Sequence, residues 1–155
     1  MTDIWKDISK GIVAGFIATI VLSALMIAKS FAGLAPQLNA IHMLAGILGS
    51  GPAGGWIAHF VIGTIFWGVL YALLDPSLPG PHWIRGAIFS IGPWLLMMVI
   101  VMPVAGAGLF GMHIGPVAPV ATFMLHIVYG VVLGATYGAL AGHAPAQQFS
   151  ESHRS

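Results

Sequence analysis

Residues 59–71 read His59-Phe60-Val61-Ile62-Gly63-Thr64-Ile65-Phe66-Trp67-Gly68-Val69-Leu70-Tyr71, and a second copy of the pattern occupies residues 126–138. In each copy a histidine stands four residues before a glycine, His59 before Gly63 and His126 before Gly130. Residues four apart lie on one face of an α-helix, one turn from each other. The apolar residues around each copy make a helix long enough to cross a bilayer. The pattern therefore predicts an integral membrane protein with two related helices.

The composition indicates that most of the chain is surrounded by lipid. Of the 155 residues, 58% are hydrophobic and only 6% are charged, whereas a soluble domain carries about 25% charged residues. The net charge of +1 gives no basic surface for a nucleic acid. The chain has no cysteine, which excludes disulfides, thiolate nucleophiles and cysteine-ligated clusters. The lipid bilayer is therefore the expected partner, and no nucleic acid is.

The hydrophobic runs predict an all-α fold, an integral membrane bundle of four transmembrane helices in one domain over residues 1–142. Spans are expected at about residues 11–28, 55–74, 84–104 and 118–142. Residues 1–10 are expected to form an amphipathic lead-in on the membrane surface, and residues 143–155 a polar cytoplasmic tail. Pro93 lies inside the third span, so we expect a kink there.

The basic residues predict the orientation of the bundle. Lys6, Lys10, Arg85 and Arg154 fall on one side of the four spans, and Lys29 falls on the other. The positive-inside rule therefore places both termini in the cytoplasm. The two long apolar loops then face the outside.

An internal repeat divides the chain into two tandem helical hairpins. Lys10-Gly11 opens the first hairpin and Arg85-Gly86 opens the second, and each ends in a span with the histidine–glycine pattern. Hairpins of equal topology suggest a pseudo-two-fold axis along the membrane normal. Small residues also favour close helix packing, both at Gly11-x-x-x-Gly15 and along the fourth span, where a stripe comprises His126, Gly130, Gly134, Gly138 and Gly142.

The paired histidines are the candidate site. An ionisable side chain inside an apolar span is a functional-site hypothesis by default. His59 and His126 lie at matched depths and are candidate ligands of one metal ion or of a b-type haem iron, with Gly63 and Gly130 leaving room for a planar ligand. Two alternatives remain open: a structural hydrogen bond from each imidazole, or a site for a quinone, a proton or another ligand.

Two further histidines, His42 and His113, are expected in the outer loops. Together with the histidines of the second and fourth spans they are candidates for a four-histidine metal cluster, and the alternative is that they are solvated interfacial side chains. Met98 and Met102 are four residues apart beside Met97, which suits Cu(I) binding or, alternatively, simple core filling.

The carboxylates argue against an enzyme or a pump. All four are expected at the periphery, outside the apolar cores of the spans, at Asp3, Asp7, Asp75 and Glu151. Transporters and proton pumps normally place an acid inside the membrane. The chain also carries no phosphate-binding loop and no hydrolase or metalloprotease motif.

Several motifs together resemble a known family. They are the Lys-Gly opening, Trp56-Ile57-x-His59-x-x-x-Gly63, Met97-Met98-x-x-x-Met102-Pro103-x-x-Gly106-x-Gly108 and His126-x-x-x-Gly130. Over about residues 8–142 the chain resembles a family of small bacterial four-helix inner-membrane proteins of unknown function, and it is more distantly similar to YagU-like proteins. The resemblance implies a multi-pass protein of the bacterial inner membrane and supplies no active site.

The resulting functional expectation is a non-enzymatic membrane protein. It would act as an accessory or scaffold subunit of a larger membrane complex, with a membrane-protein partner or a second copy of itself. The paired histidines would hold a haem or metal cofactor. The alternative is a small oligomeric transporter or channel, with the glycine stripes lining its path.

Overall fold

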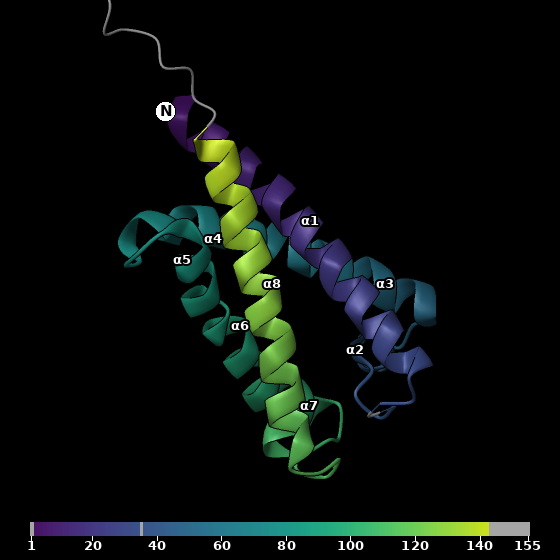
Figure 1. Cartoon of the computed structure of the whole chain (residues 1–155). Coiled ribbons are helices and arrows are strands. Elements are labelled where there is room, and N and C mark those ends of the chain that lie inside the picture. Colours follow the sequence, from purple (N-terminus) through teal and green to yellow (C-terminus); the bar gives the residue numbers. More distant parts are fainter. Residues whose placement is uncertain (1, 35, 143–155) are drawn as a thin grey trace, which may run out of the picture.

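The computed structural model describes residues 2–34 and 36–142, and within them every regular element is helical (Figure 1). The predicted polar tail, residues 143–155, lies outside the described residues. The longest helices are α1 (Thr2–Phe31) and α8 (Val117–Ala141). The shorter elements are α2 (Ala40–Ile47), α3 (Pro52–Val61), η1 (Ile62–Phe66), α4 (Trp67–Leu74), η2 (Asp75–Ser77), α5 (His82–Phe89), α6 (Ile91–Leu96), η3 (Met97–Val101), α7 (Met102–Val104) and η4 (Leu109–Gly111).

Four helical segments are long and apolar enough to cross a membrane. They cover Asp3–Phe31, Pro52–Ser77, His82–Val104 and Val117–Ala141. Many of their large apolar side chains point outward, among them Phe16, Ile65 and Ile100. A surface of this kind is stable against lipid and not against water. The prediction of an all-helical chain with four such segments is therefore confirmed.

The first helix differs from the expectation, because residues 2–10 do not form a separate lead-in. α1 runs without interruption from Thr2 to Phe31. No proline stands at the expected boundary, and the Lys10 ammonium pairs with the Asp7 carboxylate one turn earlier at 3.0 Å. The polar first turns therefore extend the first long helix along its own axis.

The centre of the fold is the pair formed by α1 and α8. α1 also packs against η1 and α4, whereas α5 packs against α8. Figure 1 shows α1 and α8 close together near the N-terminus and diverging toward the end that carries α2 and α7. We call residues 2–77 and residues 82–142 the two arms of the molecule. The arms separate on the side that carries α2 and α7.

Glycines allow the helices of each arm to approach closely. A Cβ atom added to Gly15 would lie 2.8 Å from the carbonyl oxygen of Thr64 and 2.9 Å from that of Gly63. These separations are shorter than a van der Waals contact, so the first span packs on the second through the predicted Gly11-x-x-x-Gly15 surface.

Three glycines of the stripe on α8, Gly130, Gly134 and Gly138, are covered by α5 and the residue that follows it. A Cβ atom on Gly130 would lie 2.6 Å from the Cβ atom of Ser90, and one on Gly134 would lie 3.1 Å from the Cα atom of Gly86. The flat surface of α8 is therefore filled by a helix of the same chain.

Two π-helical turns, η1 and η3, interrupt the second and third long segments. In η1 the Trp67 N–H donates to the carbonyl oxygen of Ile62, five residues earlier, so this turn contains one residue more than an α-helical turn. The third segment also breaks at Ser90, between α5 and α6. Pro93 has no N–H to donate to the carbonyl one turn earlier, which explains a break close to the expected kink.

Candidate functional site

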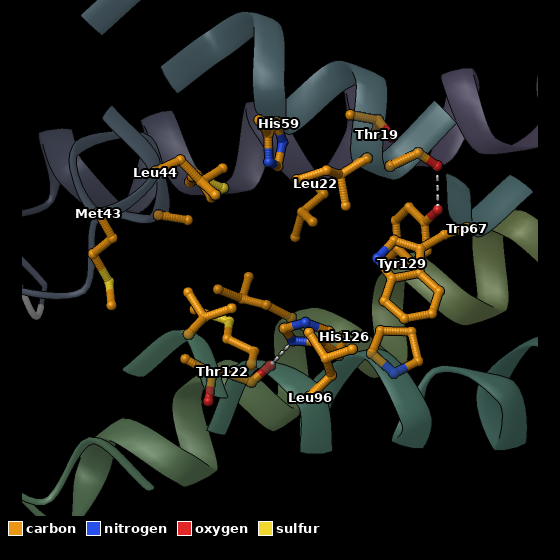
Figure 2. A pocket seen from close by; sticks show the side chains of 18 of the residues that line it. Thr19, Leu22, Met43, Leu44, His59, Trp67, Leu96, Thr122, His126 and Tyr129 are labelled. Carbon is orange, nitrogen blue, oxygen red and sulfur yellow. Dashed lines mark hydrogen bonds between the residues drawn. The ribbon is translucent and has the colours of Figure 1, made fainter. Parts of the chain in front are cut away.

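A cavity of about 410 Å³ lies between the diverging arms. Its walls come from α1, α2, the second and third long segments and α8, and they are mostly apolar. Figure 2 shows His59 and His126 projecting from opposite walls, with open space between them. The structure therefore brings the two predicted histidines to one cavity without direct contact between their rings.

His126 is held by a hydrogen bond within α8. Its Nδ1 lies 2.8 Å from the carbonyl oxygen of Thr122, one turn earlier (Figure 2). A carbonyl oxygen only accepts, so Nδ1 carries the hydrogen and a neutral ring has its lone pair on Nε2. The same arrangement, with the N–H on a backbone carbonyl and the other nitrogen unprotonated, is found in histidines that ligate metals.

His59 is held by α1 on the opposite wall. Its Nε2 lies 3.2 Å from Oγ of Ser23, and the Ser23 hydroxyl donates to the carbonyl oxygen of Thr19 at 2.7 Å. Since the serine hydrogen is already used, His59 Nε2 donates its own hydrogen to Oγ. The ring also contacts Trp56 and Phe60 edge-on. This histidine is therefore also oriented by its neighbours.

The two predicted glycines have different surroundings. Gly63 lines the cavity, and its carbonyl oxygen accepts a hydrogen bond from the Tyr129 hydroxyl at 2.5 Å. Gly130 faces Gly86 and Ser90 of the third segment. Gly130 is therefore not available to a planar ligand in this cavity, and the space beside the Gly63 Cα atom is filled by the Thr19 side chain.

The four histidines proposed as a metal cluster do not come together. His42 is exposed on α2, and His113 lies in the loop after η4, where its Nδ1 is 3.1 Å from the carbonyl oxygen of Gly106. Neither lines the cavity that contains His59 and His126. Over residues 2–34 and 36–142, no three histidine, aspartate or glutamate side chains form a group that could hold a metal ion.

The methionines also separate. Met98 and Met102 are fully buried in a small core cluster, where the Thr122 hydroxyl lies 3.8 Å from the Met98 sulfur. Met97 instead lines the cavity. The thioethers four residues apart therefore act as core side chains, in line with the alternative that we kept open.

The hydrogen bond from Tyr129 to Gly63 joins the fourth segment to the π-helical turn of the second. We expect Tyr129→Phe to lower the free energy of unfolding by about 1 kcal/mol, because the buried Gly63 carbonyl would lose this donor. Unfolding of detergent-solubilised protein by SDS, followed by circular dichroism, measures the change. Tyr137→Phe is the control, since its ring packs in the same core and its hydroxyl makes no such bond in the described residues. Equal losses in both variants would contradict the role of the hydroxyl.

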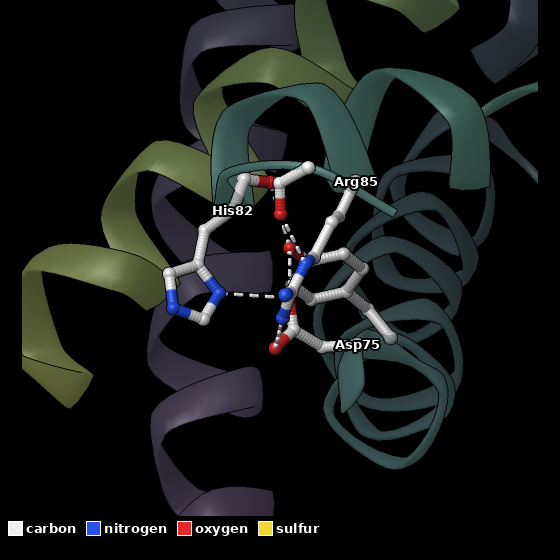
Figure 3. Close-up of polar contacts among 5 residues, drawn as sticks. Asp75, His82 and Arg85 are labelled. Carbon is white, nitrogen blue, oxygen red and sulfur yellow. Dashed lines mark hydrogen bonds and ion pairs between the residues drawn. The ribbon is translucent and has the colours of Figure 1, made fainter. Parts of the chain in front are cut away.

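A second polar cluster, centred on Asp75, lies at the other end of the bundle and was not predicted from the sequence. Asp75 is 3% exposed. Its Oδ1 accepts hydrogen bonds from the Tyr71 hydroxyl and from His82 Nδ1, both at 2.8 Å, and its Oδ2 lies 3.1 Å from Arg85 Nη1 (Figure 3). Asp75 therefore lies at the end of its segment, as expected, but it is buried and paired and not exposed at the surface. Asp75 follows Tyr71 by one helical turn, and this spacing could have indicated their hydrogen bond. The pairing with Arg85 could not be predicted, because it depends on how the proline-rich loop folds.

Comparison with known proteins gives a family and no functional relative. No curated protein and no solved structure matches the chain. A family model described as "Family of unknown function (DUF6789)" matches residues 5–148. The match includes all four apolar segments and both cavity histidines, and the chain belongs to this family of unknown function.

Proposed function

We propose that the protein is a non-enzymatic membrane protein that holds an apolar ligand or cofactor in the cavity between its two arms, with His59 and His126 as its polar contacts. The observation that carries the proposal is the state of His126. Its ring is fixed toward an apolar cavity while Nε2 has no hydrogen bond within the described residues. A polar atom that faces an apolar cavity is costly unless a ligand or a water molecule satisfies it, so Nε2 is the natural polar anchor for a ligand there. The cavity volume also falls in the range typical of small-molecule sites.

The donor set fits a haem iron or metal ion only in part. His126 has the geometry of a ligating histidine. His59 lies on the opposite wall, and its Nε2 is engaged with Ser23. A neutral His59 that donates its Nε2 hydrogen to Ser23 has its lone pair on Nδ1, so one iron bound by both imidazoles would have to bridge the open space between the walls through Nδ1 of His59 and Nε2 of His126. The geometry therefore favours a ligand that contacts the two walls separately over one metal bound by both histidines.

The expected result is a molecule that co-purifies with the protein and is lost with the histidines. The experiment is organic extraction and mass spectrometry of protein purified in mild detergent, with oxidised and reduced absorbance spectra and metal analysis on the same sample. His126→Ala is expected to retain about tenfold less of the bound compound, and His59→Ala is also expected to reduce it. His42→Ala is the matched control because His42 is exposed and does not line the cavity. A wild-type protein that carries no bound molecule, or variants that all retain it equally, would refute the proposal.

A transporter or channel has weaker support from the same structure. Three of the glycines of α8 that would line a path are covered by α5 and the residue that follows it. The buried acid Asp75 is paired with Arg85, and it does not line the cavity. A holding function needs neither a path nor an unpaired acid.

The setting of this function is part of the proposal. We place the protein in the bacterial inner membrane with both termini in the cytoplasm, as an accessory subunit beside a membrane-protein partner or a second copy. Two tandem hairpins related by a two-fold axis would bring Tyr71 and Tyr137 together, and their ring centroids are 5.4 Å apart. Tyr71 follows His59 by 12 residues, whereas Tyr137 follows His126 by 11. The π-helical turn between His59 and Tyr71 contains one extra residue, which accounts for this difference.

A further inference from the structure

The polar side chains around the cavity have used nearly all of their hydrogen-bond donors within the protein. The hydroxyls of Thr19, Thr122 and Tyr129 donate to the backbone carbonyl oxygens of Gly15, Ala118 and Gly63, respectively. The Lys29 ammonium donates to the carbonyl oxygens of Leu34 and Leu38, both at 3.0 Å. The wall therefore offers a ligand few hydrogens and several acceptor atoms.

The two histidines have also used their hydrogen-bond donors within the protein. His126 donates from Nδ1 to Thr122, and His59 donates from Nε2 to Ser23. A neutral imidazole has only one N–H, so neither ring has a second hydrogen for a ligand. Among the residues that the structure describes, no aspartate or glutamate lines the cavity, so an imidazolium there would have no counter-charge from them. Nε2 of His126 is therefore a hydrogen-bond acceptor.

One aromatic donor of the described residues remains in the same cavity. Trp67 lines the same cavity (Figure 2), and its indole nitrogen makes no hydrogen bond to the described residues. An indole N–H only donates. A hydroxyl group is the simplest ligand group that donates to an imidazole nitrogen and also accepts from an indole. The aromatic side chains in the wall, which include Phe66 and Tyr129, favour a ring beside that hydroxyl.

We infer that the ligand is an apolar ring compound with a hydroxyl group that donates to Nε2 of His126, and that the site selects hydroquinones over the corresponding quinones. This inference rests on the proposed binding function. A quinone presents only carbonyl oxygens, so its oxygen and Nε2 would be two acceptors facing each other. Burying such an unmatched pair costs free energy that a matched hydrogen bond avoids.

The test compares the oxidised and reduced forms of one compound, of which only the reduced form has hydroxyl hydrogens to donate. A short-chain ubiquinol analogue and its quinone are equilibrated anaerobically with the full-length protein in nanodiscs, and the retained ligand is quantified against empty nanodiscs to correct for lipid partitioning. We expect the hydroquinone to bind about tenfold more tightly. The O-methylated hydroquinone, which keeps the ring and lacks the donors, is expected to bind as weakly as the quinone.

Substitutions of His126 test whether the preference for the hydroquinone depends on Nε2 of this residue. His126→Phe keeps a flat ring and removes the acceptor, so the preference should fall to about one. His126→Gln restores both an acceptor and a donor and should leave a reduced preference, which keeps the test informative if the phenylalanine variant does not fold. His42→Phe, outside the cavity, should retain the full preference.

The outcomes distinguish this inference from the proposed function. Equal binding of the two forms, or tighter binding of the quinone, overturns the inference and leaves ligand binding in the cavity intact. A tenfold preference that survives His126→Phe also overturns it. If neither form binds while another molecule co-purifies, the hydroquinone assignment is wrong and the proposed function stands. If neither form binds and nothing co-purifies, both fail.

Discussion

Gly86→Val is expected to lower the free energy of unfolding by about 3 kcal/mol, because it forces a branched side chain between two helix backbones. A Cβ atom at this position would lie 2.8 Å from the backbone nitrogen of Gly134 and also clash with the carbonyl of Gly130. Neither contact is with a flexible side chain that can rotate away. The two helices would have to separate, and α5 would lose its close packing on α8. SDS-induced unfolding in detergent micelles, followed by circular dichroism, measures the loss.

The same substitution at Gly92 is the control. Gly92 lies in α6, the next helix of the same segment, and a Cβ atom there would meet nothing within 4 Å. We expect Gly92→Val to lower the free energy of unfolding by only about 1 kcal/mol, since it alters helix propensity and adds only the contact of its Cβ atom with the ring of the following Pro93. Equal stability of the two variants would show that α5 does not pack closely on the glycines of α8.

Asp75→Asn is expected to destabilise the protein by about 3 kcal/mol, because it leaves Arg85 without its buried counter-charge. The asparagine keeps the shape of the side chain, so the loss reports the charge and its hydrogen bonds. One Asp75 oxygen lies between the Tyr71 hydroxyl and His82 Nδ1 while the other faces Arg85. The same unfolding measurement applies, and Tyr71→Phe is expected to show a smaller loss of about 1 kcal/mol.

Asp7→Asn provides the matched acid on the surface. Asp7 pairs with Lys10 within α1 at 3.0 Å, and its side chain is 46% exposed. Exposed pairs of this kind contribute less than about 1 kcal/mol. A loss at Asp75 no greater than the loss at Asp7 would mean that the buried cluster does not hold the second and third segments together.

The sequence predicted the helices well because their causes are local. Residues such as Ile65 and Phe16 belong to long apolar runs, and in lipid a backbone satisfies its hydrogen bonds within one helix. The small residues Gly11 and Gly15 also indicated correctly where helices meet. The polar residues Asp7 and Lys10 suggested a separate element before the first span, whereas they continue the same helix.

The site was predicted in part. His59 and His126 were identified from their spacing, and the structure places both on one cavity. Their opposite walls were not readable from the sequence, because each wall depends on which face of its helix packs against α1 or α5. Gly130 was assigned two roles, close helix packing and room for a planar ligand, and only the packing role agrees with the structure; the sequence does not tell whether a glycine faces a ligand or another helix.

The sequence by itself therefore determined the four apolar helices, the close-packing glycines and the pair of histidines inside them. Only the tertiary structure decided that Asp75 is buried against Arg85, that Tyr129 donates to Gly63, and that the histidines face each other across open space. Helix formation depends on hydrogen bonds within a few residues of chain and on the hydrophobicity of each segment. The site depends on contacts between residues far apart in the chain, and these are set by how the helices pack.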